Sequence, residues 1–285
     1  MEIVKMAPAK INLGLDVVRK REDGYHEVKM VMQTLNLYDR LTFCDNNSGL
    51  VTISSNMTQA PATEDNIIYK ACQLIKKEYG ISSGIDVYLE KNIPVAAGMA
   101  GGSTDAAATL VALNEMFDLG LSRDVLMELG VKIGADVPYC IMQGTALSEG
   151  IGEILTPLCP MPKCYIAIAK PEVGVSTKWV YQNLDAAGLK NHPDIDKMVE
   201  AINTGDLKGI VDTMENVLET VTIPAYPQIE SIKQAMINGG AAGALMSGSG
   251  PTVFGIFEEK AAAEAVTHSL KQKGLAAQVY VATPV

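Results

Sequence analysis

Apolar and polar residues alternate along several stretches of the chain, and this period of two predicts strands. Near the N-terminus, the apolar side chains of Ile11, Leu13 and Leu15 share one face. Residues 28–37 form a strand-like run, and residues 85–90 alternate as a half-buried strand should. Shorter strands are predicted at 41–43, 50–54, 164–169, 252–257 and 278–282, with strand-like runs broken by glycines over 139–154.

Between these strands, apolar residues recur at helical spacing. The segment that starts at Asp65 opens with a cap residue, and residues 105–117 combine strong helix formers with an apolar face. A shorter helix follows, with Ser122 as its N-cap and Gly130 near its end. Further helices are predicted at 177–184, 195–203, 207–214, 228–236 and 259–271. Strands and helices in this irregular order predict an α+β fold.

The length of 285 residues suits one large domain or two domains of medium size. Three prolines fall within residues 156–162, where a linker between domains is plausible. We therefore predict an N-terminal domain over residues 1–156 and a C-terminal domain over residues 157–285. With 48% apolar and 20% charged residues, the chain has the composition of an ordinary globular protein.

Charge and cysteine usage narrow the class of partner. The formal net charge of −10 argues against nucleic acid and against an anionic membrane surface. Five cysteines without C-x-x-C spacing, in a chain without a signal peptide, predict reduced thiols in a cytoplasmic protein. The three histidines lie far apart in sequence, so no metal site is expected from them. Residues 234–257 carry no charge, but six glycines and Pro251 predict two strands and a loop instead of a membrane span.

The stretch Asn92-Ile-Pro-Val-Ala-Ala-Gly-Met-Ala-Gly-Gly-Ser-Thr-Asp105 is a glycine-rich loop that leads into a predicted helix. Its glycines let the backbone turn with positive φ and approach a ligand closely. The helix start adds N–H groups and the positive end of the helix dipole, which together attract phosphate. The hydroxyls of Ser103 and Thr104 suit a phosphate oxygen or Mg²⁺. Neither of the two common nucleotide-binding motifs is present in this stretch. The alternative interpretation, a turn that only lets a helix pack closely against a strand, therefore stays open at this point.

Three motifs resemble those of the GHMP small-molecule kinases, which include galactose, homoserine, mevalonate and phosphomevalonate kinases. The phosphate-binding motif is matched by Pro94-x-x-x-Gly-x-x-Gly-Gly-Ser-Thr-Asp-Ala106. The first motif is matched by Ala7-Pro-Ala-Lys-Ile-Asn-Leu13, and the C-terminal glycine-rich motif, which backs the active site, by residues 243–255. The resemblance spans nearly the whole chain. It implies a two-lobed α+β fold with the active site in the cleft between the lobes.

The resemblance implies a lysine and an aspartate as the catalytic pair. Lys10 would lower the pKa of the substrate hydroxyl and stabilise the transition state, and Asp136 would accept or orient the hydroxyl proton. Asn12 would contact the substrate. Without the resemblance, Lys10 is a surface lysine at a strand start and Asp136 is a turn residue. Pro138 disfavours a helical conformation of the residue before it, so we expect Asp136 at a loop-to-strand junction.

By the same resemblance, the cofactors are ATP and Mg²⁺. Asn66 and Lys91 would lie beside the adenine, and Ser103 and Thr104 are the candidates for binding the metal. Ala100 departs from the pattern, since relatives often have glycine there. The residues implied in binding the nucleotide phosphates are Pro94, Val95, Ala96, Ala97, Gly98, Met99, Ala100, Gly101, Gly102, Ser103 and Thr104.

Two further segments resemble the members of the family that recognise a cytosine. In Asp23-Gly-Tyr-His26, Tyr25 offers a ring on which a base can stack and His26 a polar edge for hydrogen bonds. Residues 171–181 resemble the segment that closes the other side of the base, with Tyr181 as the second aromatic wall. This implies a small-molecule substrate, a cytidine diphosphate-linked methylerythritol, phosphorylated on its 2-hydroxyl in the non-mevalonate route to isoprenoid precursors.

Other interpretations stay open. A kinase for another alcohol, such as homoserine or phosphomevalonate, would need no base-stacking site. A catalytically silent relative would bind nucleotide and regulate a partner, although Lys10 and Asp136 are both present. A scaffold role would leave the glycine loop and its hydroxyls unexplained.

Overall fold

The computed structural model describes residues 1–57 and 65–285 of the chain, which divides into two compact units. The first unit comprises residues 1–9, 37–93 and 100–143, and the second comprises residues 10–36, 94–99 and 144–285. Two long strands, β1 (Glu2–Lys20) and β2 (His26–Asn46), contribute residues to both units, so neither unit is continuous in sequence. The single domain boundary after residue 156 stays a prediction.

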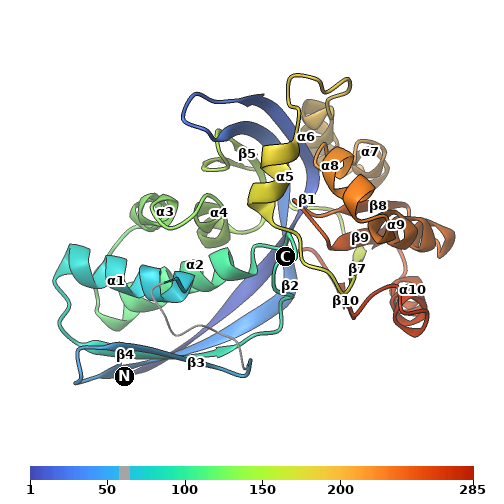
Figure 1. Cartoon of the computed structure of the whole chain (residues 1–285). Helices are drawn as coiled ribbons and strands as arrows, with labels where there is room; N and C mark the ends of the chain where they lie inside the picture. Colours follow the sequence, from blue (N-terminus) through green and yellow to red (C-terminus); the bar gives the residue numbers. More distant parts are fainter. Residues whose placement is uncertain (58–64) are drawn as a thin grey trace. The chain divides into compact units, whose positions relative to one another are not determined.

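The first unit packs helices on one face of a sheet. β4 (Gly84–Glu90) is antiparallel to β2, and β3 (Val51–Ser55) is parallel to β4. Four helices, α1 (Ile67–Tyr79), α2 (Gly101–Met116), α3 (Arg123–Val131) and α4 (Val137–Met142), lie on the same side of these strands (Figure 1). Most side chains of α2 are buried around its whole circumference, which is typical of a helix enclosed by its neighbours.

The second unit contains a four-stranded antiparallel sheet in the order β10-β7-β9-β8. Its strands are β7 (Tyr165–Lys170), β8 (Gly243–Met246), β9 (Val253–Phe257) and β10 (Gln278–Ala282). Helices α9 (Gln228–Asn238) and α10 (Lys260–Gln272) pack against this sheet (Figure 1). β5 (Thr145–Glu149) pairs with β2 and with β6 (Ile154–Pro157). The remaining helices are α5 (Thr177–Asn183), α6 (Ile195–Thr204), α7 (Leu207–Asp212) and α8 (Glu219–Ala225).

Most sequence predictions of elements are confirmed, and local chemistry explains their ends. The strand 278–282 is observed with those bounds as β10. Ser122 caps α3 by accepting a hydrogen bond from the Val125 N–H, as its position predicts. α1 is capped by Asn66 instead of Asp65, because the Asn66 side chain accepts the Ile68 N–H at 2.9 Å.

The expectation for the region after Asp136 was wrong. Residues 137–142 form helix α4, with Asp136 as its N-cap residue, so strands over the whole of 139–154 are not observed. Pro138 lies in the first turn of α4, where the N–H that proline lacks would have no partner within the helix. A proline that we expected to exclude a helix therefore sits where helices tolerate it.

Three smaller differences have similar causes. Residues 41–43 belong to β2 and do not form a separate strand. α8 was not predicted, because its residues include four weak helix formers, two threonines, a valine and Pro224. The uncharged stretch 234–257 begins as the end of α9 and only then forms two strands and a loop. Across residues 1–57 and 65–285, no helix is both long and apolar enough to cross a membrane.

Candidate active site

The backbone of the glycine-rich loop turns through the left-handed region at alternate residues. Ala96, Gly98 and Ala100 have φ values of 51°, 70° and 55°. Ala100 is also the N-cap residue of α2, and it forms no side-chain cap hydrogen bond. The first N–H groups of α2 therefore receive no side-chain capping oxygen from this residue, which suits an incoming anion. The left-handed conformation also explains why glycine suits position 100, where alanine pays a steric cost of roughly 1–2 kcal/mol.

Gly98 packs against the C-terminal glycine-rich motif, within the second unit. A Cβ atom on Gly98 would lie 2.1 Å from the backbone oxygen of Ser247 and 3.1 Å from the Gly250 nitrogen. The Ser247 hydroxyl donates a hydrogen bond to the Gly98 oxygen at 2.9 Å. The two glycine motifs are far apart in sequence but touch in the fold, and only glycine fits at position 98.

Lys10 and Asn12 lie beside the same loop. The Lys10 backbone N–H donates to the Met99 oxygen at 3.2 Å, and Lys10 Nζ donates to Asn12 Oδ1 at 2.7 Å. A Cβ atom on Gly248 would lie 3.4 Å from Asn12 Oδ1. Lys10 is only 5% exposed, so the sequence-based alternative of a surface lysine is wrong. The second unit thus brings residues from all three sequence motifs together.

Asp136 belongs to the first unit, whereas Lys10 belongs to the second. Asp136 is half-buried and stands at the start of α4, where the helix dipole favours a negative charge. A role of Asp136 opposite Lys10 stays a prediction.

The residues implied in cytosine recognition include a close aromatic pair. The rings of His26 and Tyr181 have centroids 5.1 Å apart and planes inclined at 41°. The pKa of His26 is lowered mainly by burial and to a smaller extent by the positive charge of Lys20. Its imidazole is therefore neutral at neutral pH. Its Nε2 atom is buried and has no hydrogen-bond partner in the part of the chain that the structure describes. Tyr25 is 59% exposed, which leaves its ring available for stacking.

The two residues predicted beside the adenine have structural roles. The Asn66 side chain caps α1. Lys91 is buried, and its ammonium binds Asp39, Asp105 and the Gly101 oxygen. Asp39 was not identified from the sequence. A charged residue that interrupts the apolar positions of β2 is the signal that could have identified it.

The residues at the start of α2 suit a metal ion that is held mainly by phosphate oxygens. No cluster of three histidine, cysteine, aspartate or glutamate residues that could bind a metal occurs within residues 1–57 and 65–285. The Thr104 hydroxyl is buried and has no partner among the residues described, while Ser103 is half-buried. Mg²⁺ commonly takes one or two protein ligands together with phosphates, so this sparse set fits it.

The sequence matches two family descriptions, GHMP kinases N terminal domain over residues 66–144 and GHMP kinases C terminal over residues 198–276. It is 55% identical over 281 residues to a 4-diphosphocytidyl-2-C-methyl-D-erythritol kinase of Lachnospira eligens, and the alignment covers 98% of both chains. The chain belongs to the GHMP kinase family.

Further relatives of this GHMP kinase have the same name as the Lachnospira eligens protein. It is 55% identical over 272 residues to the protein of Lachnoclostridium phytofermentans, with 95% of this chain and 94% of the relative covered. A crystal structure of a 4-(cytidine 5'-diphospho)-2C-methyl-D-erythritol kinase has a TM-score of 0.84 and 32% identity, and 99% of each chain is covered. A homoserine kinase from Cytophaga hutchinsonii has a TM-score of 0.80 at 22% identity, which shows the shared fold alone.

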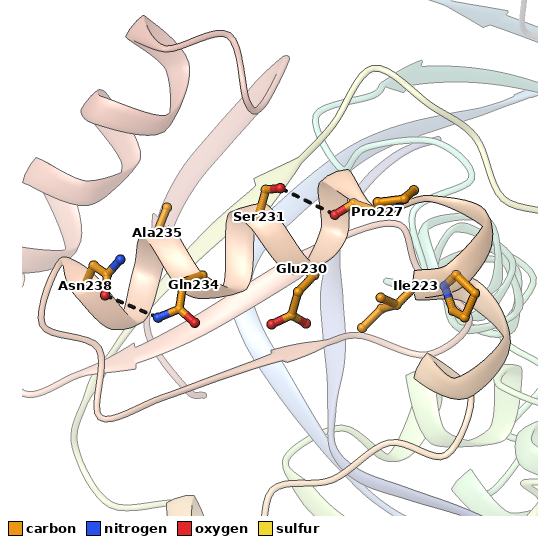
Figure 2. A pocket seen from close by; sticks show the side chains of 8 residues that line it. Ile223, Pro227, Glu230, Ser231, Gln234, Ala235 and Asn238 are labelled. Atoms are coloured by element: carbon orange, nitrogen blue, oxygen red, sulfur yellow. Dashed lines mark hydrogen bonds between the residues drawn. The ribbon is translucent and has the colours of Figure 1, made fainter.

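A separate pocket of this GHMP kinase lies on α8 and α9. Figure 2 shows side chains from Ile223 to Asn238 around it, with Glu230 and Gln234 along α9. The hydrogen bond between Gln234 and Asn238 stays within this helix. The pocket contains none of the residues predicted from the three motifs.

Proposed function

We propose that this GHMP kinase transfers the γ-phosphoryl group of ATP to the 2-hydroxyl of 4-diphosphocytidyl-2-C-methyl-D-erythritol. The observation that carries the proposal is the 55% identity to kinases of that name along nearly the whole chain. The aromatic pair of His26 and Tyr181 supports it, because a homoserine or phosphomevalonate kinase needs no site for a base. The five free cysteines support a cytoplasmic location.

In the proposed mechanism, backbone N–H groups at the start of α2 bind the phosphates of ATP. Ser103 and Thr104 would hold Mg²⁺, which would supply positive charge to the phosphates. Lys10 stabilises the negative charge that develops on the reacting hydroxyl oxygen, and Asn12 fixes the position of its ammonium through the 2.7 Å hydrogen bond. Asp136 orients the hydroxyl and accepts its proton.

The substrate base is placed by the second unit. We propose that the cytosine stacks on Tyr25 and Tyr181 and that neutral His26 forms a hydrogen bond with its polar edge. The buried and unpartnered Nε2 atom of His26 supports this role, because a buried polar atom without a partner costs free energy that a ligand can recover.

The direct test is ADP release with ATP, Mg²⁺ and one alcohol at a time. We expect release with 4-diphosphocytidyl-2-C-methyl-D-erythritol and background levels with homoserine or phosphomevalonate. ADP release with only homoserine or only phosphomevalonate would show that the chain is a kinase for that alcohol instead. Binding of an ATP analogue without release from any alcohol would favour the silent regulator.

Tyr181→Ala is expected to raise the KM for the cytidine substrate by about 5- to 150-fold, because base stacking on an aromatic ring is worth about 1–3 kcal/mol. The KM for ATP should not change. Steady-state kinetics with each substrate varied in turn measures both values. Tyr181→Phe keeps the ring and should behave as the wild type, and Tyr79→Ala removes a half-exposed tyrosine elsewhere. Equal KM values for Tyr181→Ala and Tyr79→Ala would contradict the stacking role.

A further inference from the structure

Lys91 follows β4 directly and stands before the glycine-rich loop. Its side chain is 8% exposed, and its ammonium donates to three acceptors of the first unit. These are a carboxylate oxygen of Asp39, Asp105 Oδ2 at 2.6 Å and the Gly101 backbone oxygen at 2.9 Å. A lysine ammonium has three N–H groups, so this set uses all of them. No proton of Lys91 remains to bind an adenine in this arrangement.

Asp39 holds the chain segment that enters the loop. Its carboxylate is fully buried in β2, and Oδ1 accepts the backbone N–H groups of Asn92 at 2.6 Å and Ile93 at 2.8 Å. Oδ2 accepts the Lys91 ammonium. The carboxylate therefore fixes the backbone of residues 91–93 against β2.

Asp105 and Gly101 lie at the other end of the loop, in the first turns of α2. Because both accept hydrogen bonds from Lys91, one ammonium connects the segment before the loop to the helix after it. Asparagine is close to aspartate in size and keeps one side-chain oxygen that can accept a hydrogen bond from Lys91.

We propose that Lys91 is a positioning residue, which holds the start of α2 in place for the nucleotide phosphates through Asp39 and Asp105. The inference rests on the proposed function only in taking ATP as the ligand. N–H groups that are already fixed in position bind phosphate oxygens without an ordering cost on binding. Loss of the connection should therefore weaken binding of the phosphates and leave binding of the adenosine unchanged.

Asp105→Leu removes the side-chain acceptor on α2 and leaves the Asp39–Lys91 ion pair balanced. Lys91→Met, in contrast, would leave two buried carboxylates without their cation. Asp105→Asn, which keeps an oxygen for Lys91, is the matched control, and Asp105→Ala is a second variant should the leucine not fit. Calorimetry with a non-hydrolysable ATP analogue and with adenosine gives two dissociation constants for each protein.

We expect Asp105→Leu and Asp105→Ala to weaken binding of the ATP analogue by at least about tenfold, a 1.4 kcal/mol loss, with adenosine binding unchanged and Asp105→Asn close to wild type. Equal weakening of both ligands would assign Lys91 to the base and overturn the proposal. Unchanged binding of the analogue would overturn it as well. If the wild type itself bound no analogue, the proposed function would fail instead.

Hydrogen exchange without nucleotide adds a readout that does not depend on activity. Backbone amides of residues 104–108, which donate within the first turns of α2, should exchange faster in Asp105→Leu than in Asp105→Asn, while amides of β7 in the second unit keep their rates. Unchanged exchange at residues 104–108 would contradict a positioning role.

Discussion

Asp136→Asn lowers kcat by about 10²- to 10⁴-fold, the range that general base catalysis contributes. Asparagine keeps the size of the side chain but cannot accept the proton of the substrate hydroxyl. Because Asp136 has no proposed contact with ATP, the dissociation constant of an ATP analogue should stay at the wild-type value. Rapid-quench measurement of phosphoryl transfer, together with calorimetry, separates the chemical step from binding.

The matched control for this prediction is Asp124→Asn. Asp124 lies in the first turn of α3 in the first unit, near a helix start as Asp136 is, but it is exposed and outside the motifs. Its replacement removes the same charge and should leave kcat unchanged. If Asp136→Asn kept about a third of wild-type turnover, or if both variants lost activity equally, Asp136 would not be the proton acceptor.

Gly98→Ala is expected to abolish tight nucleotide binding and to lower the free energy of unfolding. A left-handed alanine costs about 1–2 kcal/mol in backbone strain. In addition, its Cβ would lie 2.1 Å from the Ser247 oxygen, so the contact between the two glycine motifs has to open. We expect a lower thermal midpoint and at least a tenfold weaker affinity for an ATP analogue, which is about 1.4 kcal/mol.

Gly274→Ala is the control that separates backbone strain at positive φ from the steric overlap of the added Cβ atom. Gly274 has a φ of +67°, close to the +70° of Gly98, but a Cβ on it would meet no atom within 4 Å. This control should lose stability through strain alone and should bind the analogue normally. Identical midpoints and affinities for the two alanine variants would show that the packing of Gly98 on Ser247 does not support the loop.

The fold could be predicted from the sequence wherever one local signal was strong. Ser122 was recognisable as a cap, and the alternation at 278–282 predicted β10 with its observed bounds. α4 was missed because Pro138 breaks a helix interior but fits a first turn, and the sequence does not say which applies. α8 was missed because tertiary packing overrides the weak helix propensity of its residues.

Part of the candidate site could also be predicted from the sequence, and part could not. The motifs identified Lys10, Asn12 and Gly98 without showing that they meet, since hydrogen bonds such as Lys10 to Met99 join residues distant in sequence. The ion cluster of Lys91 with Asp39 and Asp105 is a contact between a strand, a loop and a helix, and no spacing rule encodes it. The resemblance implies that Lys91 lies beside the adenine, which stays a prediction, and in the structure its ammonium binds Asp39, Asp105 and the Gly101 oxygen.

The central claim is that backbone amides near residue 100 hold the phosphates of ATP while Lys10 and Asp136 act on one substrate hydroxyl. A crystal structure with an ATP analogue and 4-diphosphocytidyl-2-C-methyl-D-erythritol measures this most directly. We expect phosphate oxygens within hydrogen-bond distance of the amides at the start of α2, and Lys10 Nζ and an Asp136 carboxylate oxygen both in contact with the 2-hydroxyl. Phosphates bound elsewhere, or a 2-hydroxyl out of reach of either side chain, would contradict the account.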